Sequence, residues 1–311
     1  MKIVIAGGTG FLGRPLTVSL LKEGHEVVVL TRGSTSLPRP PTTAIAAGAR
    51  PVVWDPSGDL GPWAAEVSGA HAVVNLAGES IAGRRWTAAH KQRILDSRLR
   101  ATRSLVAAVR AAATPPTVFV SGSAVGYYGP LASDPATEEQ PAGSDFLADV
   151  CVQWEHEAQR AAGDRTRVAR IRTGIVLEKD GGALPQMLPP FRFGVGGPLG
   201  SGRQYWPWIH RDDWIALLRW TLVTPAADGA INATAPHPVT NADFARALGR
   251  AMQRPAFMPA PGFALKLLLG EMADALLLGG QNAVPAKALR GGFQFRYEHV
   301  DDALRAIFAP D

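Results

Sequence analysis

The stretch that decides the fold is "KIVIAGGTGFLGRPLTVSLL", residues 2–21, in which an apolar run leads directly into four glycines and then into a helical pattern. Gly7, Gly10 and Gly13 form G-x-x-G-x-x-G, and Gly8 with the last two also forms G-x-G-x-x-G. Glycines between a strand and a helix let the backbone turn tightly and approach a pyrophosphate, whose charge meets the N–H groups at the helix start. We therefore predict a dinucleotide site formed by Gly7, Thr9, Gly10, Phe11, Leu12 and Gly13.

Short β-branched runs and longer helical stretches alternate through the rest of the first half of the chain. Strands are expected at 26–32, 51–56, 72–78, 116–124 and 167–177, and helices at 11–24, 88–113 and 145–163. Strict alternation of strand and helix is typical of a parallel sheet covered by helices on both faces. The sequence therefore predicts an α/β fold with a doubly wound parallel sheet of the Rossmann type.

The pattern changes after residue 177. Residues 178–204 are rich in Gly and Pro and show little periodicity, and a loop of that length in a compact protein is usually functional or mobile. A helix follows at 242–254, for which Thr240 or Asn241 is a candidate cap. We predict a dinucleotide-binding Rossmann domain over 1–177, with 205–235 packing back onto it. A smaller, α-rich substrate-side and C-terminal domain is expected over 178–311.

Composition excludes several classes of protein. The 311 residues are 46% hydrophobic and 19% charged, which is typical of a globular protein, and the net charge of +5 is spread without a run of like charges. We therefore expect no nucleic-acid surface, while a diffuse positive field suits an anionic small-molecule substrate. No uninterrupted apolar run is long enough for a membrane span, so we expect no membrane partner. A monomer or a homodimer is expected.

Cysteine and histidine usage restricts the chemistry further. Cys151 is the only cysteine, which excludes an internal disulfide and a thiolate zinc site and favours a reducing, cytoplasmic location. The seven histidines stand apart in the sequence without a close pair. We therefore expect no metal site.

The end of the second predicted strand indicates which dinucleotide binds. An NAD site has an acid there to hold the ribose hydroxyls, whereas this chain has Thr31 followed by Arg32. A guanidinium can bind a 2′-phosphate through charge-assisted hydrogen bonds that contribute about 1.5–3 kcal/mol. The sequence therefore predicts NADP(H) rather than NAD(H), and the alternative is that Arg32 only faces solvent.

Several motifs together resemble the extended short-chain dehydrogenase/reductase superfamily: "GGTGFLG", "NLAG" at 75–78, "SGSAVGYYG" at 121–129 and "WIHRDDW" at 208–214. More narrowly, "NLAGESI", the doubled tyrosine and "GGPLGSGRQ" resemble its atypical epimerase family branch. That branch ends in a small domain of unknown function, which would here run from about Pro259 to Phe308. The resemblance implies an NADP(H)-binding oxidoreductase or epimerase.

The resemblance also implies site residues. In the superfamily, a region equivalent to Leu76, Ala77 and Gly78 lines the cofactor, and an acid equivalent to Asp55 contacts the adenine amine. A turn before Pro56 is a nearly equal explanation for Asp55. Glu79, at the mouth of the cleft, and Arg192 and Arg203, in the loop that wraps the substrate, are tentative substrate residues.

The catalytic set is incomplete. By resemblance Ser123 matches the serine of the superfamily's Ser, Tyr and Lys, but the Tyr-x-x-x-Lys pair is absent and Cys151 falls about where the lysine belongs. A thiol carries no positive charge and cannot replace the lysine electrostatically. Three explanations remain open: Tyr127 or Tyr128 acts with Ser123; another group acts; or no hydride chemistry occurs. The candidates for another group are Asp145, Asp149 and His156.

Two functions follow from these observations. The leading hypothesis is an atypical NADP(H)-dependent oxidoreductase or epimerase-like protein acting on a small polar substrate, such as a nucleotide sugar or a carbonyl compound. The alternative is a binding protein that senses NADP(H) with little or no turnover.

Overall fold

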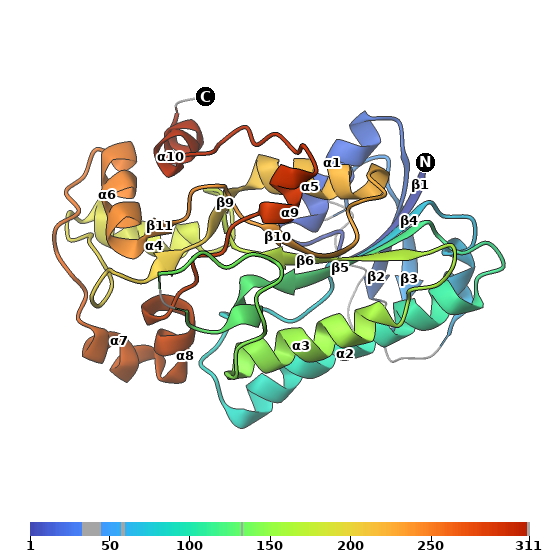
Figure 1. Cartoon of the computed structure of the whole chain (residues 1–311), viewed down its shortest axis with the longest axis horizontal. Coiled ribbons are helices and arrows are strands. Elements are labelled where there is room, and N and C mark those ends of the chain that lie inside the picture. The colour runs from blue at the N-terminus through green and yellow to red at the C-terminus, as the bar shows by residue number, and fades with distance from the viewer. Residues whose placement is uncertain (33–44, 57–59, 132, 310–311) are drawn as a thin grey trace.

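A seven-stranded parallel sheet forms the centre of the computed structural model, which describes residues 1–32, 45–56, 60–131 and 133–309 (Figure 1). Its strand order is β3-β2-β1-β4-β5-β6-β10. The strands are β1 (Lys2–Ala6), β2 (Glu26–Arg32), β3 (Arg50–Trp54), β4 (Ala72–Asn75), β5 (Val118–Ala124), β6 (Arg167–Thr173) and β10 (Gly229–Ala233). This is the predicted doubly wound α/β fold, and the order reverses between β1 and β4.

Helices cover both faces of the sheet, as its apolar strands require. In Figure 1, α1 (Gly13–Lys22) and α5 (Arg211–Val223) lie above the sheet, and α2 (Ala88–Ala111) and α3 (Phe146–Gln159) lie below it. One core cluster lies between the sheet, α1 and α5, and a second lies between the sheet and α2. The central strands are buried from both sides, so their positions are fixed by packing, whereas the edge strand β3 is largely exposed.

Local sequence explains where the long helices begin. The side chain of Thr87 accepts a hydrogen bond from the backbone N–H of His90 at the start of α2, and Asp145 accepts one from Ala148 at the start of α3. Thr240 caps α6 (Asn241–Met252) in the same way, which decides between the two predicted caps. These side chains satisfy donors that a helix start leaves unpaired.

Two predicted elements differ in the structure. The strand expected at 167–177 is divided at Gly174 into β6 and β7 (Ile175–Leu177), and β7 leaves the main sheet to pair with β9 (Trp208–His210). A side chain at Gly174 would collide with the carbonyl oxygen of Pro207, so this crossing requires glycine. The region expected to be a loop at 178–204 contains α4 (Leu184–Arg192) despite its prolines, because Leu184, Leu188 and Phe191 are buried on one face.

Much of the chain after β7 forms a lobe beside the carboxyl ends of the strands, whereas α5 and β10 pack with the central sheet. A third core cluster joins α4, α6 and α10 (Val300–Phe308). The other short elements of the chain are η2 (Pro62–Glu66), η3 (Val125–Tyr128), β8 (Tyr205–Trp206), β11 (Val239–Thr240), α7 (Gly262–Leu269), α8 (Glu271–Ala273), η4 (Asp274–Leu278) and α9 (Ala286–Arg290). The division of the chain at residue 177 stays a proposal.

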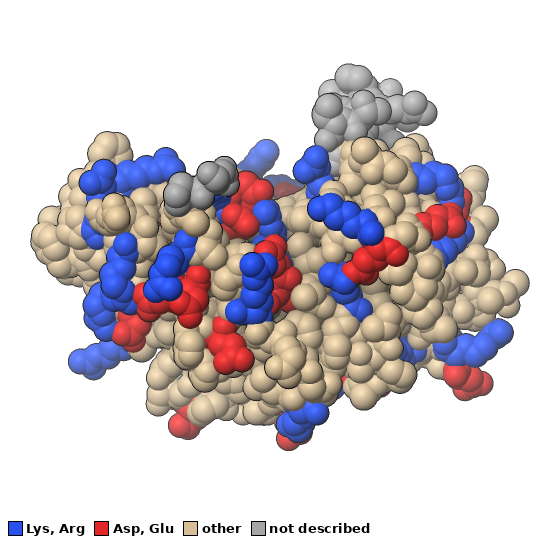
Figure 2. Space-filling view, turned by 90° about the horizontal axis from the view of Figure 1, so that it is seen from above, with Lys and Arg blue, Asp and Glu red and all other residues tan. Residues whose placement is uncertain are grey.

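Acidic and basic side chains are interspersed over the face in Figure 2. Among the described residues, no helix combines the length and apolar character that crossing a membrane requires.

Candidate functional site

The glycine-rich turn lies where the strand order reverses, which is the usual ligand position in such sheets. Gly7 has a φ of +83°, and a Cβ on it would approach the carbonyl group of Leu76 to 2.7 Å. A Cβ on Gly13 would collide with the carbonyl oxygen of Gly7. Glycine is therefore required at position 7 by the close approach of the loop to the backbone after β4, and at position 13 by the contact between the start of α1 and the loop itself.

The start of α1 has no side-chain cap. Leu12 occupies the cap position without a side-chain hydrogen bond, and the first turn holds no acidic residue. Within the loop, the N–H of Gly10 donates to the carbonyl oxygen of Gly7 over 3.0 Å. The Arg14 N–H donates to Gly10 and Pro15 has no N–H, so the loop N–H groups just before the helix, together with the positive end of the helix dipole, suit an anionic group such as a pyrophosphate.

Phe11 has a structural role in this loop. Its ring lies against Gly181 and Gly182, where a Cβ on either glycine would approach it within 3 Å, and the Arg211 guanidinium lies 5.5 Å from the ring centroid. The Phe11 side chain thus packs the glycine-rich loop against the segment after β7. Any contribution of Phe11 to ligand binding would come from its backbone.

The end of β2 places the predicted cofactor-selecting pair next to β3. Thr31 is buried, and its hydroxyl donates to the carbonyl oxygen of Val52 over 3.5 Å. Arg32 is exposed and is the register partner of Trp54, the last residue of β3. Asp55 directly follows Trp54 and is also exposed. Thr31, Arg32 and Asp55 therefore lie together at the carboxyl edge of the sheet.

The predicted segment Leu76–Gly78 is held by its own neighbour. The Asn75 side chain accepts a hydrogen bond from the N–H of Ala77 over 3.2 Å and donates one to the Thr102 hydroxyl over 3.0 Å. The tentative substrate residue Glu79 is engaged by α2, since its carboxylate lies 3.4 Å from both Arg93 Nε and His90 Nδ1.

Arg98 of α2 is a site residue that sequence reasoning missed. Its Nη1 donates to the carbonyl oxygens of Glu79 and Ile94, each over 3.0 Å, and a Cβ on Gly78 would meet the guanidinium at 3.2 Å. Burial lowers the pKa of Arg98, and no carboxylate among the described residues forms an ion pair with it. A cation without an acidic partner beside Gly78 can bind an anionic or hydroxyl-bearing ligand.

Ser123 at the end of β5 belongs to a buried ionic cluster. Its hydroxyl donates to Glu155 Oε1 over 2.7 Å, and Glu155 accepts from Arg172 Nε over 2.8 Å and Nη2 over 2.9 Å. Ser123 and Arg172 are register partners on β5 and β6. Neither Glu155 nor Arg172 was predicted; the arginines that interrupt the apolar strand "RVARIRT" were the available signal.

The two predicted tyrosines have different surroundings. The Tyr128 hydroxyl is buried, donates to Asn232 Oδ1 over 2.6 Å and accepts from Arg172 Nη1 over 3.0 Å. Burial raises the pKa of Tyr128 to about 12. Tyr127 is only partly buried, and the Arg172 guanidinium lies 3.4 Å from its ring centroid. Tyr128 therefore has a structural position, and Tyr127 is the accessible one.

The other candidate groups have ordinary roles. Asp145 caps α3, the Asp149 carboxylate accepts from the Gln153 amide over 2.9 Å, and His156 is exposed. Cys151 is buried with its sulfur 3.7 Å from the carbonyl oxygen of Ala124. Asp145, Asp149 and His156 are therefore accounted for by local contacts or exposure, while Cys151 lies beside Ser123, and a catalytic role for Tyr127 stays a prediction.

The tentative substrate arginines lie on the C-terminal lobe. Arg192 is exposed in the last turn of α4, and Arg203 is exposed in the loop before β8. Neither side chain forms a hydrogen bond or ion pair within the described parts of the chain. Their role in substrate binding stays a prediction.

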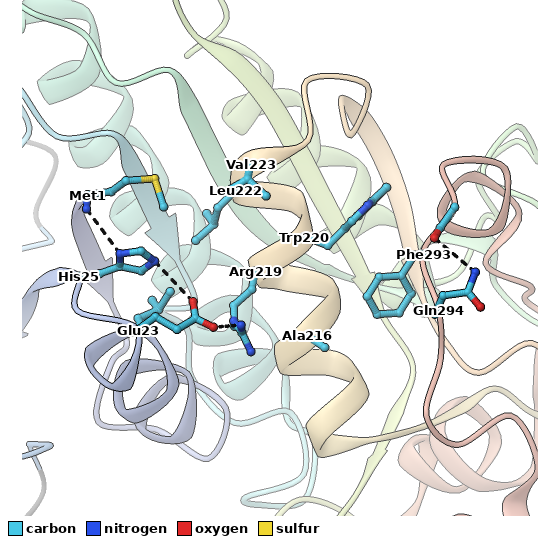
Figure 3. Close-up of a pocket in the computed structure, with 12 residues that line it drawn as sticks. Met1, Glu23, His25, Ala216, Arg219, Trp220, Leu222, Val223, Phe293 and Gln294 are labelled. Atoms are coloured by element: carbon cyan, nitrogen blue, oxygen red, sulfur yellow. Dashed lines mark hydrogen bonds and ion pairs between the residues drawn. The ribbon is translucent and has the colours of Figure 1, made fainter.

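Two hollows lie near α1 and α5. The smaller, of about 350 Å³, is lined by residues at the amino ends of the strands; in Figure 3, Glu23 lies between His25 and Arg219. This hollow lies at the opposite end of the strands from the glycine-rich turn and does not suit the predicted cofactor. A groove of about 870 Å³ runs along α1 and α5 and reaches Thr9 and Gly10.

Comparisons with known proteins agree with this geometry. Residues 3–233 match the NAD dependent epimerase/dehydratase family, and residues 260–307 match a domain of unknown function. The chloroplastic SDR39U1 homolog of Arabidopsis thaliana, an epimerase family protein, is 43% identical over 309 residues, which cover 99% of this chain and 86% of the relative. The SDR39U1 protein of Bos taurus is 39% identical over 99% of this chain and 100% of its own length.

Two solved structures share both fold and sequence with the chain. Human epimerase family protein SDR39U1, crystallised with NADPH, has a TM-score of 0.88 and 36% identity, covering 99% of each chain. A nucleoside-diphosphate sugar epimerase from Corynebacterium glutamicum has a TM-score of 0.77 and 33% identity, covering 99% of this chain and 58% of that one. The matches bear out the predicted relationship, including the C-terminal domain, whereas the cytoplasmic location stays a prediction.

Proposed function

Since the chain belongs to the NAD-dependent epimerase/dehydratase family, we propose that it binds NADP(H) and acts as an atypical oxidoreductase or epimerase on a small polar substrate. The observation that carries the proposal is the glycine-rich loop before the uncapped start of α1: its Gly7 packs against the Leu76 backbone, and Arg32 ends the neighbouring strand. The human relative crystallised with NADPH supports the same cofactor.

The residues present fit the cofactor. The N–H groups at the start of α1 would bind the pyrophosphate, and the Arg32 guanidinium would bind the 2′-phosphate. Asp55 and the segment Leu76–Gly78 would line the adenosine side. Arg98, which forms no ion pair with any carboxylate in the described ranges, would bind a further polar group of the cofactor beside Gly78.

Substrate chemistry would take place at the ends of β5 and β6. Bound NADPH supplies a hydride. Because the Ser123 hydroxyl donates its proton to Glu155, its oxygen is free to accept a hydrogen bond from a substrate hydroxyl. At the carbonyl oxygen that the hydride would reduce, Tyr127 would donate its phenol proton, and the nearby Arg172 cation would stabilise the negative charge left on the phenol oxygen.

The second candidate function is an NADP(H)-sensing protein without turnover. The specific observation in its favour is the absence of the family's lysine, together with the neutralisation of Arg172 by Glu155. A paired guanidinium is a weaker electrostatic substitute than a free ammonium group.

Cofactor selection is tested by calorimetric titration of the protein with NADPH and NADH. We expect Arg32→Ser to weaken NADPH binding by about 10- to 100-fold while leaving NADH binding unchanged, because only the 2′-phosphate contact is lost. Arg110→Ser, an exposed arginine near the end of α2, is the matched control. Equal affinity of the unmodified protein for both cofactors would contradict the assignment.

Turnover is tested by following NADPH consumption and epimer formation over a panel of carbonyl compounds and nucleotide sugars. Tyr127→Phe should lower kcat by about 10²- to 10⁴-fold with unchanged NADPH affinity, since only the proton-transfer group is removed. Tyr205→Phe on β8 is the control. Tight NADPH binding without turnover on the whole panel would favour the sensor.

A further inference from the structure

Three exposed side chains from two separate segments converge on the C-terminal lobe. His237 lies between β10 and β11, and Glu298 and His299 directly precede α10. One potential ligand atom from each residue lies within 4.8 Å of the other two. The two imidazole rings are stacked, with centroids 4.7 Å apart and planes inclined by 4°.

No internal bond explains this convergence. Within the described part of the chain, none of the three side chains forms a hydrogen bond or an ion pair. The acidic residues in the first turn of α10 are engaged elsewhere, because Asp301 pairs with Arg250 and Asp302 pairs with Arg305. The imidazole nitrogens and the Glu298 carboxylate are therefore free to bind a ligand.

The backbone holds both segments in place. His237 lies between Pro236 and Pro238, whose rings restrict the local dihedral angles, and its carbonyl oxygen accepts a hydrogen bond from Trp208 Nε1 over 3.1 Å. On the other segment, the N–H of Tyr297 donates to Asp213 Oδ2 over 2.9 Å. Because both segments are already fixed, binding a ligand between them would cost little backbone conformational entropy.

We propose that His237, Glu298 and His299 form a binding site for a divalent transition-metal ion of the Zn²⁺ class. Two imidazole nitrogens and one carboxylate oxygen are a ligand set that Zn²⁺ accepts, with water in the fourth position, whereas Mg²⁺ and Ca²⁺ prefer oxygen ligands. Tetrahedral zinc holds its ligand atoms about 3.3 Å apart. To bind the ion, one imidazole must turn out of the stack, because the lone pairs of parallel rings do not converge; this rotation would also bring the ligand atoms closer together.

The bound ion would join the segment between β10 and β11 to the start of α10. Since α10 packs against α6 in the third core cluster, and both helices lie away from the sheet in Figure 1, the ion would stabilise the C-terminal lobe rather than the sheet. The site is separate from the glycine-rich turn, so the proposal does not depend on the proposed function.

The test uses the full chain without a histidine tag, freed of metal by a chelator, and titrates it calorimetrically with ZnCl₂ and MgCl₂. We expect one saturable zinc site, no comparable magnesium binding, and a higher unfolding temperature with zinc. His237→Ala and His299→Ala should each weaken zinc binding by roughly tenfold or more, and Glu298→Gln should weaken it as well. His156→Ala, an exposed histidine on α3, is the matched control and should leave zinc binding unchanged.

The proposal is overturned if no saturable zinc binding occurs, or if the His237→Ala/His299→Ala double variant binds zinc as tightly as the unmodified chain. All three residues are exposed, so these variants should fold. Circular dichroism of each variant verifies this.

Discussion

At the scale of single residues, Cys151 shows that surroundings decide reactivity. It is the only cysteine and lies near Ser123, where the family's lysine would be expected. The side chain is buried, and this burial raises the pKa of the thiol to about 11 from a usual value of 9.0. The nucleophilic thiolate is therefore scarce at neutral pH.

We predict that iodoacetamide alkylates Cys151 slowly in the folded protein and rapidly in guanidinium chloride, as followed by mass spectrometry. Because the folded protein keeps the thiol protonated, the unfolded chain gains stability by ionising first. The folded state should lose up to roughly 2–3 kcal/mol between about pH 9 and 11, and Cys151→Ala should remove this loss. Rapid alkylation of the native protein would contradict the buried position.

The sequence predicted some of the site residues because their chemistry is local. Gly7 and Gly13 are set by a tight turn within one short segment, so their spacing is sufficient. Glu155 and Arg172 come from different elements, and their pairing arises only when α3 packs onto β6. The sequence also did not distinguish the roles of Tyr127 and Tyr128, because the burial of Tyr128 depends on β10, which is distant in the sequence.

At the scale of elements, the junction of β1 and α1 combines folding and binding. Gly13 begins α1 and touches the backbone of Gly7, so the helix start and the loop are in direct contact. The same contact places the loop directly at the amino end of α1, where we predict that the pyrophosphate binds.

We predict that Gly13→Ala abolishes measurable NADPH binding, because its Cβ would collide with the carbonyl oxygen of Gly7 and displace the loop. The matched control is Gly163→Ala, where a Cβ meets no atom within 4 Å and the residue is exposed. The control should change the free energy of unfolding by no more than about 0.5 kcal/mol. Calorimetric titration and chemical denaturation of both variants measure the two effects, and unaltered NADPH binding by Gly13→Ala would disprove the backbone-contact argument.

The element pattern was predictable wherever periodicity is strong. The strands and helices of the first half follow from apolar runs and caps such as Asp145. The division at Gly174 was not predictable, because it depends on the approach of Pro207 from a distant segment. Similarly, α4 was not predicted, because its three prolines disfavour a helix. The helix is stabilised by the burial of Leu184 and Phe191 in the lobe, which local sequence does not show.

At the scale of the whole molecule, one core crosses the proposed domain boundary. The cluster on the α1 and α5 side of the sheet includes Ile3 and Ile5 of β1 and also Phe293 and Phe295 near the C-terminus. His237 and His299 likewise meet on the C-terminal lobe from segments that are far apart in the sequence. The spacing of residues in the sequence does not predict such contacts between distant segments.

A continuous core should make the chain unfold as one unit rather than as two independent domains. We predict that Phe295→Ala, at a side chain 8% exposed, lowers the free energy of unfolding by about 3–5 kcal/mol and shifts the whole calorimetric transition. Phe257→Ala is the control, since that ring is 72% exposed and its loss should cost no more than about 0.5 kcal/mol. If residues 1–177 formed a separately stable domain, a second transition would remain unshifted in the Phe295→Ala variant. Because Phe295 packs in the same cluster as the strands, we expect no such transition.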